Sequence, residues 1–295
     1  MEEKIEIVED RRIPKEENVR VLKLPYRLPK KLTALLNGFK WAINSKKQSA
    51  VLVVDGRSGM GKTTISTQIG LFMSKNFSLD NIHFTPESFL EALTRTNKGD
   101  TLVFDEAMLL SSRAALSTMN RMIVIAMSMI RSKNLFIIFN VNSIFDLDKN
   151  LALSRADLLL HCYGESLTDK GKFLAFFRGG DGMDRIKSLY LYGKKYYSYG
   201  SPKANFNSNF SSYFTVNEDE YERKKQIGVE KFLKGTKSSV GVKERASRDL
   251  LIKYIYENKD KLDITQEQIA EIAKIHRTTV IKAIKGEENE NFPGI

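Results

Sequence analysis

A glycine-rich segment in the first quarter of the chain carries the residue types that bind phosphate. It fits the pattern G-x-x-x-x-G-K-[S/T] in full, as Gly56-Arg57-Ser58-Gly59-Met60-Gly61-Lys62-Thr63, with Thr64 following. Glycines let the backbone turn tightly and direct its N–H groups inward, and a helix that starts there adds a positive dipole end. Lys62 would neutralise the β- and γ-phosphates, and the Thr63 hydroxyl would bind Mg²⁺. Residues 56–64 are therefore predicted to bind ATP with Mg²⁺.

A pair of adjacent acids supplies the second half of this chemistry. The apolar run Thr101–Phe104 is typical of a buried strand, and Asp105-Glu106 follows it directly. Asp105 is predicted to hold Mg²⁺ through water, and Glu106 to orient and activate the attacking water. A lone acid near the start of a helix is common, since it favours the helix dipole. Together with the upstream glycine loop, the pair indicates ATP hydrolysis coupled to movement or remodelling.

The elements around these residues alternate between strand and helix. Short β-branched or apolar runs at 51–54, 101–104 and 135–139 predict buried strands. Stretches with helical spacing lie between them, at 62–75, 86–93 and 116–131, and another precedes them at 32–43. Such alternation predicts an α/β fold with a doubly wound, mostly parallel sheet. Two further strand-like stretches follow at 157–163 and 173–177.

Residues 187–203 are rich in tyrosine and lysine, and this composition has two interpretations. Exposed aromatic rings among cations could stack the bases of a single strand of nucleic acid. Alternating tyrosines are more often packed along a half-buried strand, and we favour packing here. Residues 200–217, rich in Ser and Asn, are expected to complete the core before a linker that is charged and helical from about Glu218.

The motif order resembles that of the FtsK–HerA superfamily of P-loop ATPases. The resemblance covers roughly residues 48–165 and rests on the glycine loop, Asp105-Glu106, a long helix ending in Arg131, and a strand ending in Asn140. Members of this superfamily pump DNA, as chromosome translocases, conjugation ATPases, viral packaging ATPases and zonular-occludens-toxin-like proteins of filamentous phages. The resemblance implies a RecA/FtsK-like core. It also implies that Asn140 senses the γ-phosphate, where the superfamily usually has Gln. The AAA+ and RecA-type ATPases are the alternative relatives.

The same resemblance implies a homo-oligomeric ring, with a hexamer expected, in which a neighbour's arginine completes each site. Such an arginine stabilises the charge that develops on the transferred phosphate. Arg131 is the best match and Arg113 the alternative, while Arg121 and Arg155 lie in the same part of the chain. For each of them, a surface position or a contact with the DNA backbone is an equally good interpretation.

The carboxyl-terminal segment 265–285 has the spacing of a helix-turn-helix. Thr265 is a predicted helix cap with Gln268 at the capping-box position, and Val280 is predicted to anchor the second helix. The segment resembles bacterial and archaeal DNA-binding domains, although Lys274 stands where they usually have glycine. The second helix would then enter the major groove of DNA, with a helical hairpin for protein contacts as the alternative. Its predicted DNA contacts are His276, Arg277, Thr278, Thr279 and Lys282.

The amino-acid composition favours some classes of function and excludes others. Lys and Arg number 47 against 36 Asp and Glu, so the net charge is +11, which favours a polyanionic partner or a solvated basic surface. A single cysteine, Cys162, excludes a disulfide framework and a cysteine zinc cluster, and the three scattered histidines make a zinc hydrolase a poor fit. No apolar run is long enough for a membrane span and no signal peptide is evident, so a cytoplasmic protein is expected.

Four segments are expected: a basic arm and helix (1–48), an ATPase domain (49–217), a linker (218–243) and a helix-turn-helix domain (244–295). The expected function is ATP-driven translocation or packaging of double-stranded DNA by a ring. One alternative is an ATP-switched, sequence-specific DNA-binding regulator or partition factor. Another is an export ATPase of the zonular-occludens-toxin kind, which would need a separate membrane partner.

Overall fold

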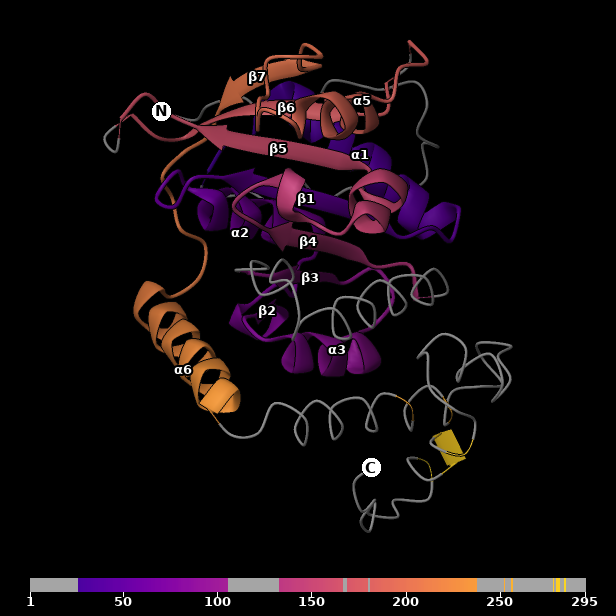
Figure 1. Cartoon of the computed structure of the whole chain (residues 1–295), viewed down its shortest axis with the longest axis vertical. Helices are drawn as coiled ribbons and strands as arrows, with labels where there is room; N and C mark the ends of the chain where they lie inside the picture. The colour runs from indigo at the N-terminus through magenta and orange to yellow at the C-terminus, as the bar shows by residue number, and fades with distance from the viewer. Residues whose placement is uncertain are drawn as a thin grey trace, which may run out of the picture.

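The structure, a computed structural model, describes residues 26–105, 133–166, 169–179 and 181–237, with single positions at 252, 256, 278, 280, 281 and 284. The described residues form an α/β fold around one seven-stranded sheet with helices on both faces (Figure 1). The elements in chain order are α1 (Lys30–Ser45), β1 (Ala50–Gly56), α2 (Lys62–Met73), β2 (Ile82–His83), α3 (Pro86–Arg95), β3 (Thr101–Phe104), β4 (Phe136–Asn140), β5 (Leu158–Tyr163), β6 (Lys172–Phe177), α5 (Arg185–Gly193), β7 (Phe206–Asn209) and α6 (Glu218–Lys237).

The sheet is mostly parallel, as the sequence predicts. Its strand order is β2-β3-β4-β1-β5-β6-β7. The first five strands run parallel to their neighbours, and β6 and β7 are added antiparallel at one edge. The predicted α/β class is therefore confirmed, with a mixed sheet.

Two apolar layers sandwich the sheet, and β1 contributes to both. Leu52 and Val54 pack with α1 and α2 on one face. Val51 and Val53 pack with α3, α5 and the turns after β4 on the other face. Every residue of β1 is buried, because a central parallel strand covered on both faces has no solvent side. This explains why its first five residues, 50–54, are a continuous apolar run.

The connections after β1 and β4 diverge. The chain leaves β1 through α2 to reach β2 at the far edge of the sheet. It leaves β4 through a 3-10 turn, Ile144–Asp146, and a π-helical turn, Leu151–Arg155, to reach β5 on the other side of β1. The two connections cover opposite faces, so a crevice opens at the carboxyl ends of β1 and β4. Ligands of open α/β sheets bind in such a crevice.

Two segments differ in structure from their sequence-based description. The tyrosine-rich stretch forms helix α5 and the turn after it, because Ile186, Leu189 and Tyr190 repeat at helical spacing and are buried. Tyr192 and Tyr196 are more than 70% exposed, so they do not pack as a strand edge would require. Residues 218–237 form helix α6, in the region expected to be charged and helical, but its first turns contact the core instead of only linking two domains.

Candidate functional site

The glycine loop lies between the end of β1 and the start of α2, and two of its glycines are required by close contacts. Gly56 has φ +133°, and a Cβ there would lie 2.1 Å from the carbonyl oxygen of Cys162 on the neighbouring strand β5. Gly61 caps α2 in the left-handed region with φ +87°, and a Cβ would lie 2.9 Å from Phe210. At Gly56 a larger residue would push the loop off the sheet, because the close atom belongs to the backbone of β5. At Gly61 the left-handed φ favours glycine, as the predicted tight turn requires.

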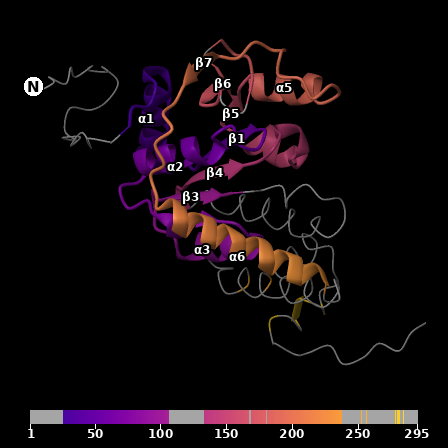
Figure 2. The same cartoon turned by 90° about the vertical axis from the view of Figure 1, so that its left-hand side faces the viewer.

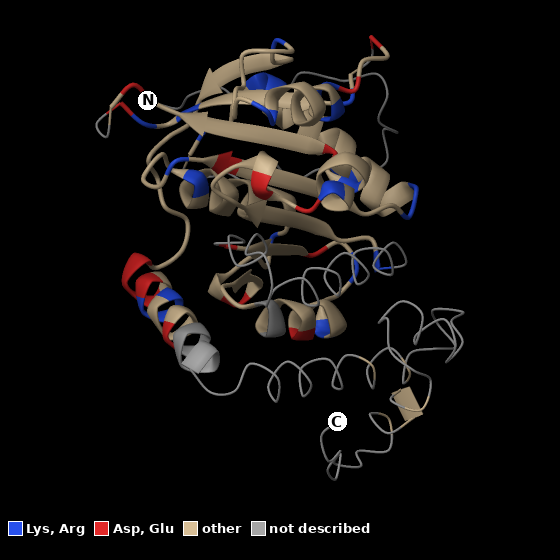
Figure 3. Ribbon diagram, in the orientation of Figure 1, with Lys and Arg blue, Asp and Glu red and all other residues tan. Residues whose placement is uncertain are grey.

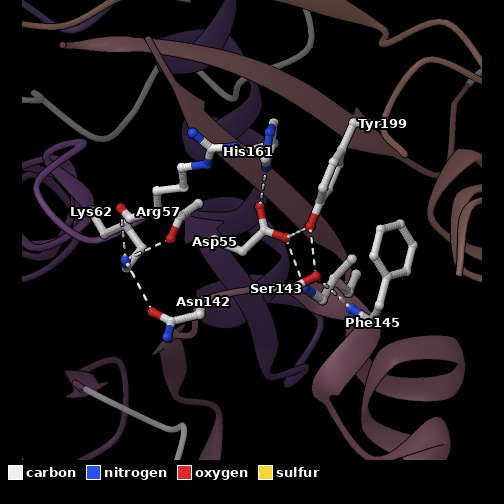
Figure 4. Close-up of polar contacts among 10 residues, drawn as sticks. Asp55, Arg57, Lys62, Asn142, Ser143, Phe145, His161 and Tyr199 are labelled. Carbon is white, nitrogen blue, oxygen red and sulfur yellow. Dashed lines mark hydrogen bonds and ion pairs between the residues drawn. The ribbon is translucent and has the colours of Figure 1, made fainter. Parts of the chain in front are cut away.

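Lys62 is folded back over this loop. Its Nζ donates to the carbonyl oxygens of Gly56 at 2.7 Å and Arg57 at 3.1 Å, and lies 3.5 Å from Oδ1 of Asn142 (Figure 4). Lys62 is also the first residue of α2, whose amino-terminal N–H groups favour an anion. A positive side chain and a helix terminus therefore meet at the mouth of the loop.

The acid at the end of β3 reaches the first turn of α2. β4 separates β3 from β1, so the two strands are about 10 Å apart at the usual spacing of 4.8 Å. Helix α2 packs across β4 and closes this distance. The Thr63 hydroxyl donates to Oδ2 of Asp105 at 3.0 Å. The two predicted motifs, 42 residues apart in sequence, therefore share one site.

Asn140, at the end of the intervening strand, fixes Asp105 from the other side. Its amide donates to Oδ1 of Asp105 at 3.0 Å, and its own oxygen accepts from the Ser66 hydroxyl. Asn140 is completely buried. This amide, which is predicted to sense phosphate, lines the pocket, and both of its ends are bonded within the protein. Two residues later, the exposed Asn142 is the amide that lies beside Lys62.

Thr63 and Asp105 offer one hydroxyl and one carboxylate, the hard oxygen ligands that Mg²⁺ accepts. Within the described parts of the chain, no group of three or more His, Cys, Asp or Glu side chains could hold a metal ion. Mg²⁺ is typically bound by one or two protein groups together with substrate phosphates and water, rather than by a cage of protein ligands. The donor set therefore fits Mg²⁺ that arrives with a nucleotide.

A pocket of about 300 Å³ opens in front of these groups. The glycine loop, the carboxyl ends of β3 and β4, the β5–β6 turn and the start of α6 form its walls. The charged side chains that line it are Lys62, Asp105, Lys170, Glu218, Glu222 and Lys225. Among the predicted loop residues, Met60 has its side chain in the core, so only its backbone can face the pocket.

Behind the loop, the carboxylate of Asp55 joins three segments (Figure 4). It accepts from the backbone N–H of Ile144 at 2.7 Å and from the hydroxyl of Tyr199, and lies 2.8 Å from Nδ1 of His161. The rings of His161 and Tyr199 stack with centroids 3.5 Å apart. Burial, followed by the charge of Asp55, raises the pKa of Tyr199, so its hydroxyl stays protonated and donates. The base of the glycine loop is thus attached to β5 and to the loop after β4.

The sequence did not indicate eight of the residues that line the pocket. They come from the loop after β4, the β5–β6 turn and the segment that runs into α6: Val141, Asn142, Lys170, Phe214, Glu218, Tyr221, Glu222 and Lys225. None belongs to a recognisable motif, and α6 follows Asp105 by more than a hundred residues. Only the pattern Asn-Val-Asn at 140–142 offered a signal, because it places two amides at the end of one strand.

Cys162, by contrast, belongs to the core. Its thiol is buried, and burial raises its pKa, so it is a poor nucleophile.

Several predicted site residues lie outside the described ranges: Glu106, Arg113, Arg121, Arg131, His276, Arg277, Thr279 and Lys282. Arg155 is described, and it precedes β5, at the sheet edge opposite the pocket. Thr278 is exposed, and Val280, the predicted anchor of the second helix, is completely buried.

In the part of the chain that the structure describes, no helix combines the length and apolar character needed to cross a membrane. Comparison of the sequence with protein-family models and with curated proteins gives no match.

Proposed function

We propose that the chain is an ATPase of the FtsK–HerA type, which binds Mg²⁺·ATP in this pocket and hydrolyses it. The observation that carries the proposal is the 3.0 Å hydrogen bond between the Thr63 hydroxyl and the Asp105 carboxylate, beside the glycine loop. A chance glycine-rich turn would have no reason to meet an acid at the end of another strand. The parallel strands β1, β4 and β3 bring the loop, Asn140 and Asp105 to one edge of the sheet.

The residues of the pocket suit phosphate binding. Lys62 is bonded to two neutral carbonyl oxygens, and phosphate oxygens would replace them with charged acceptors, which make stronger hydrogen bonds. The exposed amide of Asn142 is better placed than Asn140 to contact the γ-phosphate. Mg²⁺, held by Thr63 and through water by Asp105, would neutralise charge on the phosphates. Glu106 is adjacent to Asp105, so it would orient the attacking water at the same edge.

Double-stranded DNA is the proposed substrate of movement. The net charge of +11 and the helix-turn-helix pattern of 265–285 both favour a polyanionic duplex. A ring of subunits would place Arg131 or Arg113 of one copy at the phosphate of the next. This part of the proposal rests on charge, motif order and resemblance.

Steady-state ATP hydrolysis tests the proposal, measured with and without linear double-stranded DNA at two salt concentrations. Lys62→Ala serves as the blank. DNA should stimulate the wild-type protein, and the stimulation should fade with salt because phosphate contacts release counterions. Wild-type hydrolysis no faster than that of Lys62→Ala would refute an ATPase.

Glu106→Gln addresses the catalytic assignment. Loss of a group that assists proton transfer costs about 100- to 10,000-fold in rate, so hydrolysis should fall at least 100-fold while ATP still binds. Glu91→Gln is the matched control, since Glu91 pairs with Arg95 on the exposed side of α3. Equal hydrolysis by Glu106→Gln and wild type would remove Glu106 from the mechanism.

Mixing variants tests the shared site. Arg131→Ala subunits keep their own ATP pocket, and Lys62→Ala subunits keep the arginine. If the arginine acts on a neighbour, each variant is inactive alone and the mixture regains activity. A mixture as inactive as its parts would exclude Arg131, and the same experiment then applies to Arg113.

A second candidate function is the ATP-switched DNA-binding regulator. One observation favours it: Tyr221 of α6, the helix that leads toward 244–295, is bonded directly to Asp105. A protein shortened after Lys237, the last residue of α6, separates the two functions. A motor should keep much of its ATPase activity and lose targeting, whereas a regulator should lose its entire response to DNA.

A further inference from the structure

The first turns of α6 form one wall of the phosphate pocket. The chain leaves β7 and runs along the edge of the sheet past β1, β4 and β3 before α6 begins (Figure 2). From this helix, Glu218, Tyr221, Glu222 and Lys225 line the pocket. Acidic residues gather at the amino end of the helix (Figure 3). The segment that leads to the carboxyl-terminal domain therefore touches the site where phosphate would bind.

Tyr221 is the anchor of this contact. It is only 3% exposed, and its hydroxyl donates to Oδ2 of Asp105 at 2.7 Å and lies 3.4 Å from Oγ1 of Thr63. Its ring packs edge-on against Phe84 and Phe214, with both centroids 5.3 Å away. Two turns further, Gly228 lies so close to Phe84 that a Cβ would come within 2.8 Å of it. The helix is therefore held by two hydrogen bonds to the core and by a small apolar contact: Tyr221 donates to Asp105, and Lys224 Nζ donates to the Leu79 carbonyl at 2.7 Å.

The hydrogen bonds of Asp105 show what this anchor competes with. Oδ1 accepts from Asn140, while Oδ2 accepts from both Thr63 and Tyr221. The phenol is the donor in its bond to Oδ2, because a carboxylate oxygen can only accept. A water molecule on Mg²⁺ would also donate to Asp105. The phenol and that water therefore need the same carboxylate.

The charges on α6 also disfavour its contact with the core when a nucleotide occupies the pocket. From α6, Glu218 and Glu222 face the pocket that would receive a nucleoside triphosphate with several negative charges, and the single cation Lys225 offsets only one of them. Like charges at a few ångströms repel each other, and the repulsion is greatest where water is partly excluded. Loading of the pocket should thus weaken the contact of α6 at two points.

We propose that Tyr221 is a latch between the metal site and α6: Mg²⁺·nucleotide breaks the Tyr221–Asp105 bond and releases the first turns of the helix. This inference rests on the proposed function. It gives nucleotide occupancy a direct route to α6 and to the segment that follows it. Because linkage is reciprocal, whatever holds α6 in place also weakens nucleotide binding.

Hydrogen–deuterium exchange of the α6 amides tests the latch in the full-length protein. The probe is a non-hydrolysable ATP analogue, added with Mg²⁺ or with a chelator. Exchange of residues 218–230 should rise at least fivefold with Mg²⁺ and analogue, and should stay slow with analogue and chelator. Tyr221→Phe keeps the ring contacts but lacks the hydroxyl, so its α6 should exchange fast even without nucleotide.

Affinity supplies the second measurement. Tyr221→Phe should bind the Mg²⁺-loaded analogue about 5- to 10-fold more tightly than wild type, because no latch has to open first. Tyr190→Phe is the matched control: Tyr190 is also 3% exposed, and its hydroxyl donates to the Leu147 carbonyl, away from the pocket. This control should leave both measurements unchanged.

Three results would overturn the latch. One is tight analogue binding by wild type with no change in α6 exchange. Another is weaker binding by Tyr221→Phe, which would show that the phenol supports the loaded site. The third is that wild type does not bind the analogue, or binds it no more tightly than Lys62→Ala does. That result would overturn the proposed function and the latch together. The first two leave the nucleotide site standing, so the two failures are distinguishable.

Discussion

Replacing Asp55 tests whether the base of the glycine loop depends on one buried carboxylate. Asp55 is completely buried and accepts from Ile144 N–H and the Tyr199 hydroxyl, with His161 as its third partner. Asp55→Ala leaves these donors without an acceptor inside the core. Each unsatisfied buried donor costs about 1–3 kcal/mol, and Ser143 can still accept from Tyr199 at 3.1 Å. We therefore expect a loss of about 2–4 kcal/mol in the free energy of unfolding.

Asp55→Asn separates the carboxylate's charge from its role as an acceptor. The amide oxygen can still accept from Ile144 and Tyr199, and the NH₂ group can donate to His161 when that ring carries its proton on Nε2. The loss should then be about 1 kcal/mol. Asp146→Asn is the control, because this exposed carboxylate accepts from the exposed Tyr197 at 2.9 Å. It should change stability by less than about 0.5 kcal/mol.

Urea unfolding followed by far-UV circular dichroism measures all three variants. With a slope of about 3 kcal/mol per M, Asp55→Ala should lower the midpoint by about 1 M. The reasoning fails if the free energy of unfolding of Asp55→Ala lies within about 1 kcal/mol of the wild-type value, since the buried donors left unsatisfied should cost more than that. It also fails if Asn and Ala are equally damaging, because then the charge alone would matter.

The remaining predictions concern backbone space, pH and phosphate binding. Gly56→Ala should destabilise the protein by more than about 3 kcal/mol in the same assay, because its Cβ meets the Cys162 carbonyl at 2.1 Å, whereas Gly38→Ala, with open space around it, should be neutral or stabilising. Burial lowers the pKa of His83 to about 4, and the positive charges of Lys224 and Arg95 contribute less to the same shift. The unfolded chain therefore takes up a proton below pH 6.5 that the folded chain does not. Stability should therefore fall by up to about 3 kcal/mol as the pH drops from 6.5 to 4, and urea midpoints of His83→Leu should lack this part of the fall; parallel pH curves for variant and wild type would contradict it. Lys170→Ala, which removes a cation from the pocket wall, should weaken binding of the ATP analogue about 3- to 10-fold by calorimetry, while Lys187→Ala on α5 should not; unchanged affinity would place Lys170 outside the phosphate contacts.

The parts of the site that the sequence predicts are those with local signatures. The glycine loop needs its residue types at fixed offsets, and β1 begins with a continuous apolar run, 50–54, because both of its faces are covered. Asp105 was identifiable because it ends a second such run. Each of these inferences uses fewer than ten consecutive residues.

The parts of the site that the sequence does not predict depend on long-range contacts. Tyr221 meets Asp105 across 116 residues, and nothing in its helix marks that tyrosine. The role of Asn140 depends on which strand lies between β1 and β3, which the order of elements along the chain does not state. In α5, alternating tyrosines imitate strand periodicity, while burial of Ile186, Leu189 and Tyr190 follows the helix.

The central position of β1 has a consequence for how the protein is made. Its two neighbours, β4 and β5, are translated much later, and His161, the partner of Asp55, follows it by 106 residues in the sequence. A nascent chain therefore exposes a strand with five consecutive apolar residues, 50–54, until residue 163 has left the ribosome. Non-local pairing of this kind slows folding and leaves the intermediate prone to aggregation. Chains released before Tyr163 should depend on chaperones, and the phosphate pocket gains its last wall only when α6 emerges.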